Sequence, residues 1–163
     1  MKKLLPVLAF LLFHLADLAA AVTTDLAQEK AAVLAVVQQF FDALHTRDGE
    51  GLRATCQPGA QVTAGRLTES GYALRQRSIE VDIAQLATAK EVWLERMWSP
   101  TVHLNGRIAV VWTRYDFHRD GKLSHNGTDC FTLLKTDTGW KIACLAYSAE
   151  PATQTENPAG PPQ

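Results

Sequence analysis

The chain has 163 residues, 47% of them hydrophobic, and its 16 basic and 17 acidic residues give a formal net charge of −1. Because the basic residues form no runs, this composition argues against a nucleic-acid-binding surface and against an anionic membrane surface. The length suits one domain with a sizeable core, and the partner that we expect is small or apolar.

The first 21 residues have the pattern of a cleaved export signal. Two lysines open the segment, an apolar core of signal-peptide length follows, and three alanines at residues 19–21 precede the expected cleavage site. A membrane anchor is the alternative, but a spanning helix needs about 20 apolar residues, and Asp17 falls inside this segment. The sequence therefore predicts a signal peptide over residues 1–21 and a periplasmic or secreted bacterial protein with no membrane attachment after cleavage.

In the first half of the mature chain, apolar residues follow the period of an α-helix. Apolar residues recur at helical spacing from Thr24 to the RDGE run at Arg47–Glu50, which predicts one long amphipathic helix. A short helix over Glu50–Cys56 and a brief strand over Gln61–Ala64 follow. Ser78 is placed to cap a third helix, whose apolar face carries Ile79, Ile83 and Leu86.

After Lys90 the pattern alternates, which is typical of strands. Asn105-Gly106 and Asp120-Gly121 fit two-residue hairpin turns, and Thr136–Gly139 fits a longer one, so we expect an antiparallel meander of about four long strands. Helices followed by such a sheet predict an α+β fold, a domain over residues 22–150 in which helices pack in the concave face of a curved sheet. This geometry forms a cone with an open mouth. Residues 151–163 are rich in Pro, Gly, Gln and Thr and are predicted to be a disordered tail.

The turns also predict which residues share a face of the sheet. If both two-residue turns are tight, Glu95 lies opposite Asp116, and Asp116 lies opposite His125. The same register places Phe131 near Cys144 and Leu133 near Ile142. One β-bulge would reverse these assignments. Both faces are partly apolar, which predicts a homodimer that covers one of them.

In this register several polar groups converge on one face: Glu95, Trp112, Arg114, Asp116, His125 and Asp129, with Phe131 beside them. A carboxylate across from an imidazole fixes its tautomer and raises its basicity, so His125 and Asp116 are the candidate catalytic pair. Two neighbouring carboxylates would raise the pKa of one of them unless a cation neutralises the charge. A structural polar network, a ligand-binding site and a catalytic site all remain open readings.

Three cysteines, Cys56, Cys130 and Cys144, are an odd number for an exported chain, so at most one bridge can form within it. The predicted register places Cys130 and Cys144 on opposite faces, which disfavours a bridge between them. No Cys/His spacing indicates a metal site, and no cofactor is expected. His118 lies close to a turn and is predicted to be exposed.

The segments QQFFDALHTRDGEGL and WLERMWSPTVHLNGRIAVVWTRYDFHRDGKLSHNGTDCFTLLKTDTGWKIACLAYS together resemble the nuclear transport factor 2-like (NTF2-like) superfamily. Within it they are most similar to small bacterial proteins of the SnoaL-like and "putative lumazine-binding" groups, over residues 24–150. The resemblance implies a cone-shaped α+β fold. It does not choose among isomerases, dehydratases, cyclases, binding proteins and interaction modules.

The ketosteroid isomerases of the superfamily allow a sharper comparison. The resemblance implies that their catalytic tyrosine, base and protonated carboxylic acid correspond to Phe40, Ala64 and a position near Phe131. None of these three residues has the required chemical group, so we do not expect a ketosteroid isomerase. We expect an exported protein that binds a small, partly apolar ligand in a pocket of the cone. Glu95 and the other polar candidates line this pocket. A dehydratase, isomerase or cyclase that uses the His-Asp pair and a dimeric interaction module without ligand are the alternatives.

Overall fold

The computed structural model describes the backbone of residues 5–162 and the side chains of residues 25–162. The chain divides into two compact units, residues 1–32 and residues 33–163, and helix α1 (Leu5–Thr46) contributes to both. The predicted signal peptide lies outside the described side chains and stays a prediction. Within the described part of the chain, no helix combines the length and apolar character needed to span a membrane.

The helices of the second unit follow the sequence pattern. Helix α1 ends at Thr46, where Arg47 takes a positive φ of 59° at the predicted RDGE run. Helix α2 (Gly49–Thr55) is capped by Asp48, whose side chain accepts a hydrogen bond from the Gly51 amide. Helix α3 (Ile79–Thr88) is capped by Ser78 as predicted, and its three predicted core residues are buried: Ile79, Ile83 and Leu86.

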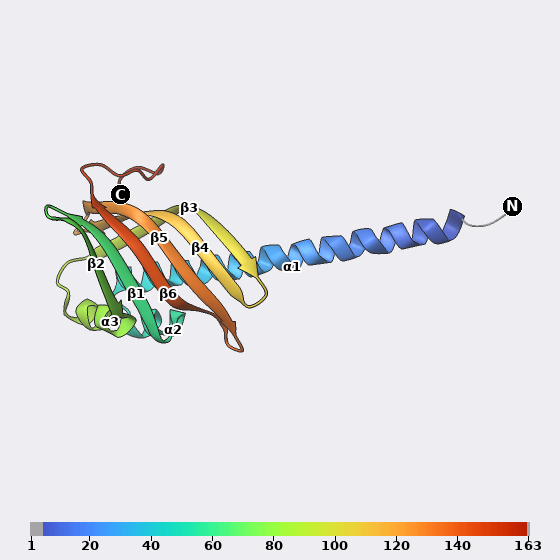
Figure 1. Cartoon of the computed structure of the whole chain (residues 1–163), viewed down its shortest axis with the longest axis horizontal. Coiled ribbons are helices and arrows are strands. Elements are labelled where there is room, and N and C mark those ends of the chain that lie inside the picture. Colours follow the sequence, from blue (N-terminus) through green and yellow to red (C-terminus); the bar gives the residue numbers. More distant parts are fainter. Residues whose placement is uncertain (1–4, 163) are drawn as a thin grey trace. The chain divides into compact units, whose positions relative to one another are not determined.

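Six strands form one sheet: β1 (Cys56–Thr68), β2 (Gly71–Ser78), β3 (Trp93–Asn105), β4 (Ile108–Arg119), β5 (Lys122–Thr136) and β6 (Gly139–Pro151). Their order is β2-β1-β6-β5-β4-β3, and only the β1–β6 pair is parallel within the described sheet. The predicted α+β fold and four-strand meander are confirmed. The predicted brief strand is the middle of the much longer β1, and β2 was not predicted. Figure 1 shows the curved sheet, with α2 and α3 beside the β1–β2 end.

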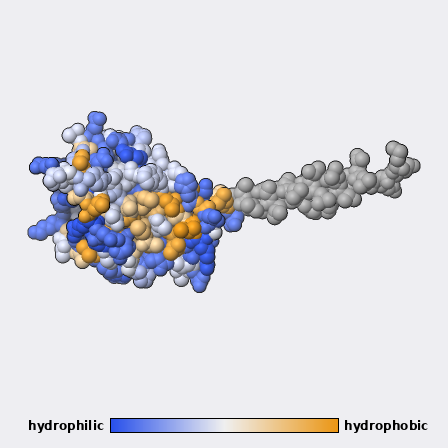
Figure 2. All heavy atoms as spheres, viewed as in Figure 1, coloured by the Kyte–Doolittle hydropathy of each residue, from blue (hydrophilic) through white to orange (hydrophobic). Residues whose placement is uncertain are grey.

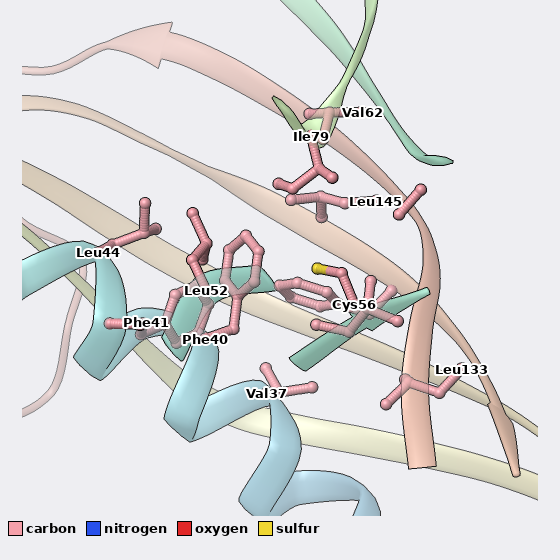
Figure 3. Close-up of a cluster of buried hydrophobic side chains, with 14 of the residues drawn as sticks. Val37, Phe40, Phe41, Leu44, Leu52, Cys56, Val62, Ile79, Leu133 and Leu145 are labelled. Carbon is pink, nitrogen blue, oxygen red and sulfur yellow. The ribbon is translucent and has the colours of Figure 1, made fainter. Parts of the chain in front are cut away.

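The core lies between the end of α1 and the concave face of the sheet. Phe40 and Phe41 each meet Phe131 edge to face, with ring centroids 5.6 and 5.7 Å apart. Aliphatic residues from α1, α2, β1, α3 and β6 surround this aromatic cluster, as Figure 3 shows for Val37, Leu44, Leu52, Val62, Ile79 and Leu145. The predicted packing of helix against concave face is therefore confirmed.

Bulges shift the register that tight turns alone predict. The turn at Asp120-Gly121 forms as expected, with Arg119 opposite Lys122, but an irregularity between Phe117 and His118 places Phe117 opposite His125. Asp116 consequently lies opposite Asn126, so its predicted pairing with His125 is wrong.

The first hairpin shows a second difference. Its turn lies one residue later than predicted, with Asn105 opposite Ile108. Together with an irregularity between Trp98 and Thr101, this places Glu95 opposite Phe117, so the predicted pairing of Glu95 with Asp116 is wrong.

These shifts exchange the two faces of β4. Its concave face carries the buried residues Ala109, Val111, Thr113 and Tyr115, together with Phe117. Its convex face carries Ile108, Val110, Trp112, Arg114 and Asp116.

The β5–β6 hairpin combines a correct and an incorrect prediction. Leu133 pairs with Ile142 as predicted, but an irregularity next to this pair places Phe131 opposite Leu145 and not Cys144. Because Cys130 pairs with Ala146 and Cys144 with Thr132, the two cysteines share the convex face, contrary to the prediction. Both are free thiols.

The segment after Pro151 contains no helix or strand up to residue 162, but it makes specific contacts with the convex face. The Thr155 hydroxyl donates to the Asp116 carboxylate, and the Gly160 carbonyl accepts from Arg96 at 2.8 Å. The Gln154 carbonyl accepts from the Asn126 side chain at 3.0 Å. Composition alone does not predict these hydrogen bonds.

Candidate functional site

The concave side of the second unit contains a cavity of about 500 Å³. Apolar and aromatic side chains from α1 and four of the strands line it: Phe40, Leu44, Val62, Trp93, Phe117 and Leu145. A cavity of this size and character is in the range of small-molecule sites. The cone that the sequence predicts is therefore open and not filled by its own side chains.

A pair of carboxyl groups lies at this cavity. Glu95 on β3 lines it, and Asp129 on β5, which is only 1% exposed, lies close enough for each carboxyl group to shift the pKa of the other. No N–H or hydroxyl group among the described residues donates to either oxygen of Asp129. Two carboxyl groups can hydrogen-bond to each other only if at least one carries a proton.

The electrostatic surroundings of the pair favour that proton. Burial raises the pKa of Glu95 to about 8, and the charges of Asp116 and Asp82 add to this effect. Burial and the neighbouring Glu95 raise the pKa of Asp129 well above its usual range. Since no cation opposes these effects, the pair holds at least one proton at neutral pH. It can then donate a hydrogen bond as well as accept one.

Tyr115 forms the wall beside the carboxyl pair. Its ring packs over Gly127, where a Cβ atom would lie 2.5 Å from the Tyr115 ring and 2.0 Å from the Ser148 carbonyl oxygen. The Tyr115 hydroxyl donates to this same carbonyl at 2.8 Å. Burial and the two carboxyl groups raise the pKa of Tyr115, so it stays a neutral phenol. The absence of a side chain at Gly127 thus makes room for the Tyr115 ring.

His125 also lines the cavity, between two aromatic rings. It stacks on Phe117 with centroids 5.1 Å apart and meets Tyr115 edge to face at 5.7 Å. Burial lowers the pKa of His125 to about 4, and the charges of Arg66 and Arg119 act in the same direction. The imidazole is therefore neutral at pH 7, with Nδ1 3.0 Å from the Ser124 hydroxyl.

Asp116 lies on the other face of the sheet, away from this site. Its carboxylate accepts two hydrogen bonds from Arg96, at 3.0 and 2.5 Å, and one from Thr155, while His118 Nε2 lies 3.2 Å away. Burial alone would raise the pKa of Asp116, but the hydrogen bonds from these neighbours hold it below its usual value. The predicted catalytic pair is therefore not brought together. His118, predicted to be exposed, is 2% exposed.

The other predicted site residues divide between the two faces. Glu95 and His125 line the cavity, and Asp129 contacts Glu95 from the buried side. Phe131 is on the concave face but belongs to the core. Trp112 is 55% exposed on the convex face, where Arg114 contacts Glu156 and donates to Thr128 at 3.1 Å.

The sequence pattern missed the arginines of the cavity. Arg66 on β1 and Arg75 and Arg77 on β2 line it because their strands form an antiparallel hairpin. The alternation of small or apolar residues with arginine in GRLTESGYALRQRS is the signal that could have identified this hairpin. A fourth arginine, Arg119, follows from the shifted register of β4.

Metal-binding groups do not gather in the described part of the chain: no three His, Cys, Asp or Glu side chains there are placed to hold an ion. The chemistry of the cavity rests on one carboxyl pair, one neutral imidazole and four guanidinium groups. Together they can bind a ligand that presents a polar atom to Glu95 and an apolar surface to the aromatic wall.

Most of the chain matches the model of one protein family. Residues 28–148 match the model of the family described as "Putative lumazine-binding". A comparison with curated proteins finds no match to the sequence.

Solved structures share the fold. An NTF2-like protein from Cytophaga hutchinsonii superposes with a TM-score of 0.63 at 15% identity, covering 74% of this chain and 97% of the other. An NTF2-like protein of unknown function from Shewanella baltica gives 0.58 at 19% identity, covering 77% and 97%. A protein from Streptomyces avermitilis, named a putative dehydratase of the NTF2-like family, gives 0.59 at 16% identity, covering 75% and 96%. At these identities the likeness extends to the fold alone.

Proposed function

Because the chain belongs to the "putative lumazine-binding" family and has the NTF2-like fold, we propose that it binds a small, partly apolar molecule in its cone. The observation that carries this proposal is the open cavity of about 500 Å³, whose wall combines apolar and aromatic side chains with a few polar groups that include Glu95. Such a wall supplies the hydrophobic contribution, and a few placed polar groups orient the ligand.

Each part of the site has a place in this proposal. The flat rings of Trp93 and Phe117 offer faces for an apolar or aromatic body. Glu95 is the polar group that a ligand meets, because Asp129 is 1% exposed and lies behind it. Because the pKa of both carboxyl groups is raised, Glu95 can donate a proton to a lone pair of the ligand in addition to any proton held between the two groups.

Native mass spectrometry of the protein purified from the compartment where it is made tests the proposal. We expect a retained small molecule, which is lost in Ala73→Trp because Ala73 lines the cavity on β2 and an indole there would narrow its mouth. Gln76→Trp is the matched control, since Gln76 is exposed on the same strand and does not line the cavity. A molecule retained equally by both variants would be bound elsewhere, and no binding of any apolar ligand by wild type would contradict the proposal.

A second candidate is proton-transfer catalysis in the same cavity. It is favoured by the position of Glu95, whose carboxyl group lines the cavity where a ligand would lie. Burial raises the pKa of Glu95 to about 8, which suits a group that gives and takes a proton near neutral pH. His125 is neutral and lines the same cavity. Under this hypothesis Glu95, and not the predicted pair of His125 and Asp116, is the group that transfers the proton. Any turnover of the retained molecule would then depend on Glu95.

We further propose that the protein works as a homodimer after export. Export rests on the sequence of residues 1–21. The dimer is supported by exposed apolar residues on the convex face, Ile108, Trp112 and Leu134. Figure 2 shows hydrophobic residues gathered over β4, β5 and β6 on that face. Apolar patches of this kind mark interaction surfaces.

A further inference from the structure

The mouth of the cone carries positive charge that the protein does not neutralise. Of the four arginines in the cavity wall, Arg77 pairs with Asp82 at 2.6 Å, and Arg119 lies 3.6 Å from Glu91. Among the described residues, Arg66 and Arg75 make neither a hydrogen bond nor an ion pair. The cavity therefore has two guanidinium groups that are available to a ligand.

The register of the hairpin brings these two arginines to the same place. Arg66 lies opposite Ala73, and Arg75 lies opposite Ala64, so the arginines are diagonal neighbours on one face of β1 and β2. Diagonal neighbours have Cα atoms about 7–8 Å apart, within reach of a common partner for such long side chains. The two alanines across from them leave the space between the guanidinium groups unfilled.

The charge of these arginines reaches into the cavity. Arg66 contributes to the low pKa of His125, and it also acts on Tyr115 in the opposite direction to the carboxyl pair. The acidic groups of the wall do not cancel it, because Asp82 is paired with Arg77 and burial raises the pKa of Glu95 to about 8, which favours its neutral form. A positive mouth above an apolar interior is complementary to a molecule with a negative end.

Building on the proposed function, we propose that the natural ligand is an amphipathic organic anion whose singly charged oxyanion is bound by Arg66 and Arg75. Its apolar body lies against Phe117 and Leu145 deeper in the cone. Guanidinium groups bind carboxylates through charge-assisted hydrogen bonds of defined geometry. A carboxylate fits this mouth better than a dianionic phosphate, because Asp82 also lines the cavity.

Two dyes that differ only in charge test the inference. 1-Anilinonaphthalene-8-sulfonate carries a sulfonate, and N-phenyl-1-naphthylamine is the same ring system without it. We expect the anionic dye to bind about tenfold more tightly, measured by fluorescence titration, and this preference to weaken as salt screens the charges. Decanoate should displace the dye at about a tenth of the concentration that decan-1-ol requires.

The double variant Arg66→Gln/Arg75→Gln assigns the preference to these residues. We expect it to abolish the tenfold difference while the neutral dye binds as to wild type. Arg107→Gln is the control, because Arg107 is exposed and pairs with Asp137 outside the cavity. Ala73→Trp should weaken both dyes, which places them in the cone and not on the convex face.

The outcomes separate this inference from the function on which it rests. If the neutral dye binds in the cone as tightly as the anionic one, or if the preference survives in the double variant, the anionic ligand class is wrong while the apolar site stands. If neither dye is sensitive to Ala73→Trp, the cone does not take apolar molecules and both proposals fail.

Discussion

Single residues decide what the cone can bind. Glu95 and Asp129 come from strands that are not adjacent in the sheet, since β4 lies between β3 and β5, yet each carboxyl group raises or lowers the pKa of the other. The missing side chain at Gly127 lets the Tyr115 ring lie flat against β5. Glu95 is a carboxyl group with a raised pKa in a wall that also carries four arginines and His125.

The carboxyl pair predicts how stability changes with pH. The pKa of Glu95 is raised to about 8 in the folded protein, so folding retains protons that the unfolded chain releases near its ordinary pKa. The contribution of the pair is therefore fully present below the unfolded pKa and is lost as pH rises through about 8. Between pH 6.5 and pH 8 we expect Glu95 to lower the unfolding free energy of wild type by roughly 1–2 kcal/mol. His125, whose pKa of about 4 in the folded protein lies below its ordinary 6.5, acts in the opposite direction and offsets a small part of this loss.

Asp129→Asn should flatten this dependence, because the amide donates to Glu95 without itself ionising. Urea unfolding at several pH values measures it. Asp137→Asn, at a residue 98% exposed, is the control and should follow the wild-type curve. Parallel curves for Asp129→Asn and wild type would show that the carboxyl pair is not the source of the loss.

The sequence identified part of this site for a physical reason. His125 and Asp129 share a face because strand alternation is reliable along an uninterrupted stretch. Glu95 shares it too, because Phe117 takes the place predicted for Asp116 in both pairings and the two differences cancel. Trp112, Arg114 and Asp116 were assigned to the wrong face because a single bulge reverses every later side chain, and no residue type announces a bulge. Arg66, Arg75 and Arg77 were missed because the β1–β2 hairpin was not recognised, and Arg119 was missed because of the shifted register of β4.

Among the elements, helices and turns followed from the sequence better than strand pairing did. Ser78 predicted the start of α3, and Asp120-Gly121 predicted a hairpin turn, in which both residues have positive φ, 48° and 74°. These features depend on local chemistry. The parallel pairing of β1 with β6 joins segments far apart in the sequence, and local patterns carry little information about such contacts.

The C-terminal segment makes an element-scale prediction. The Thr155 hydroxyl donates to Asp116, whose carboxylate is 0% exposed, and a hydrogen bond to a buried charged group contributes about 1.5–3 kcal/mol. We expect Thr155→Val to lower the unfolding free energy by about 1–2 kcal/mol in urea titrations.

Thr153→Val is the matched control for the segment. Thr153 is exposed and makes no hydrogen bond in the described part of the chain, so its replacement should change stability by less than about 0.5 kcal/mol. Equal stability of the two variants would mean that the hydrogen bond from Thr155 to Asp116 does not form in solution. The segment would then be the disordered tail that its composition predicts.

At the scale of the whole molecule, the two faces of the sheet differ in what covers them. The end of α1 packs against the concave face, which contains the hydrophobic core and the cavity. The convex face has no helix to cover it in the second unit, yet it carries Ile108, Trp112 and Leu134 at 49%, 55% and 40% exposure. Ile108 and Leu134 are directly paired, and Trp112 lies four residues further along β4, so the three form one patch.

This patch makes the homodimer testable. A stable interface buries about 800 Å² per partner, and an exposed indole near its centre contributes a large share of the binding energy. We expect the wild-type protein to sediment as a dimer and Trp112→Glu to sediment as a monomer, because dimerisation would bury an unpaired carboxylate.

Val81→Glu, at an exposed apolar residue on α3, is the control and should remain dimeric. If Trp112→Glu stays folded and dimeric, the interface lies on another face, and a monomeric wild type at all concentrations would exclude the dimer. Since the cavity opens on the opposite face of the sheet, loss of the dimer should leave dye binding in the cone unchanged.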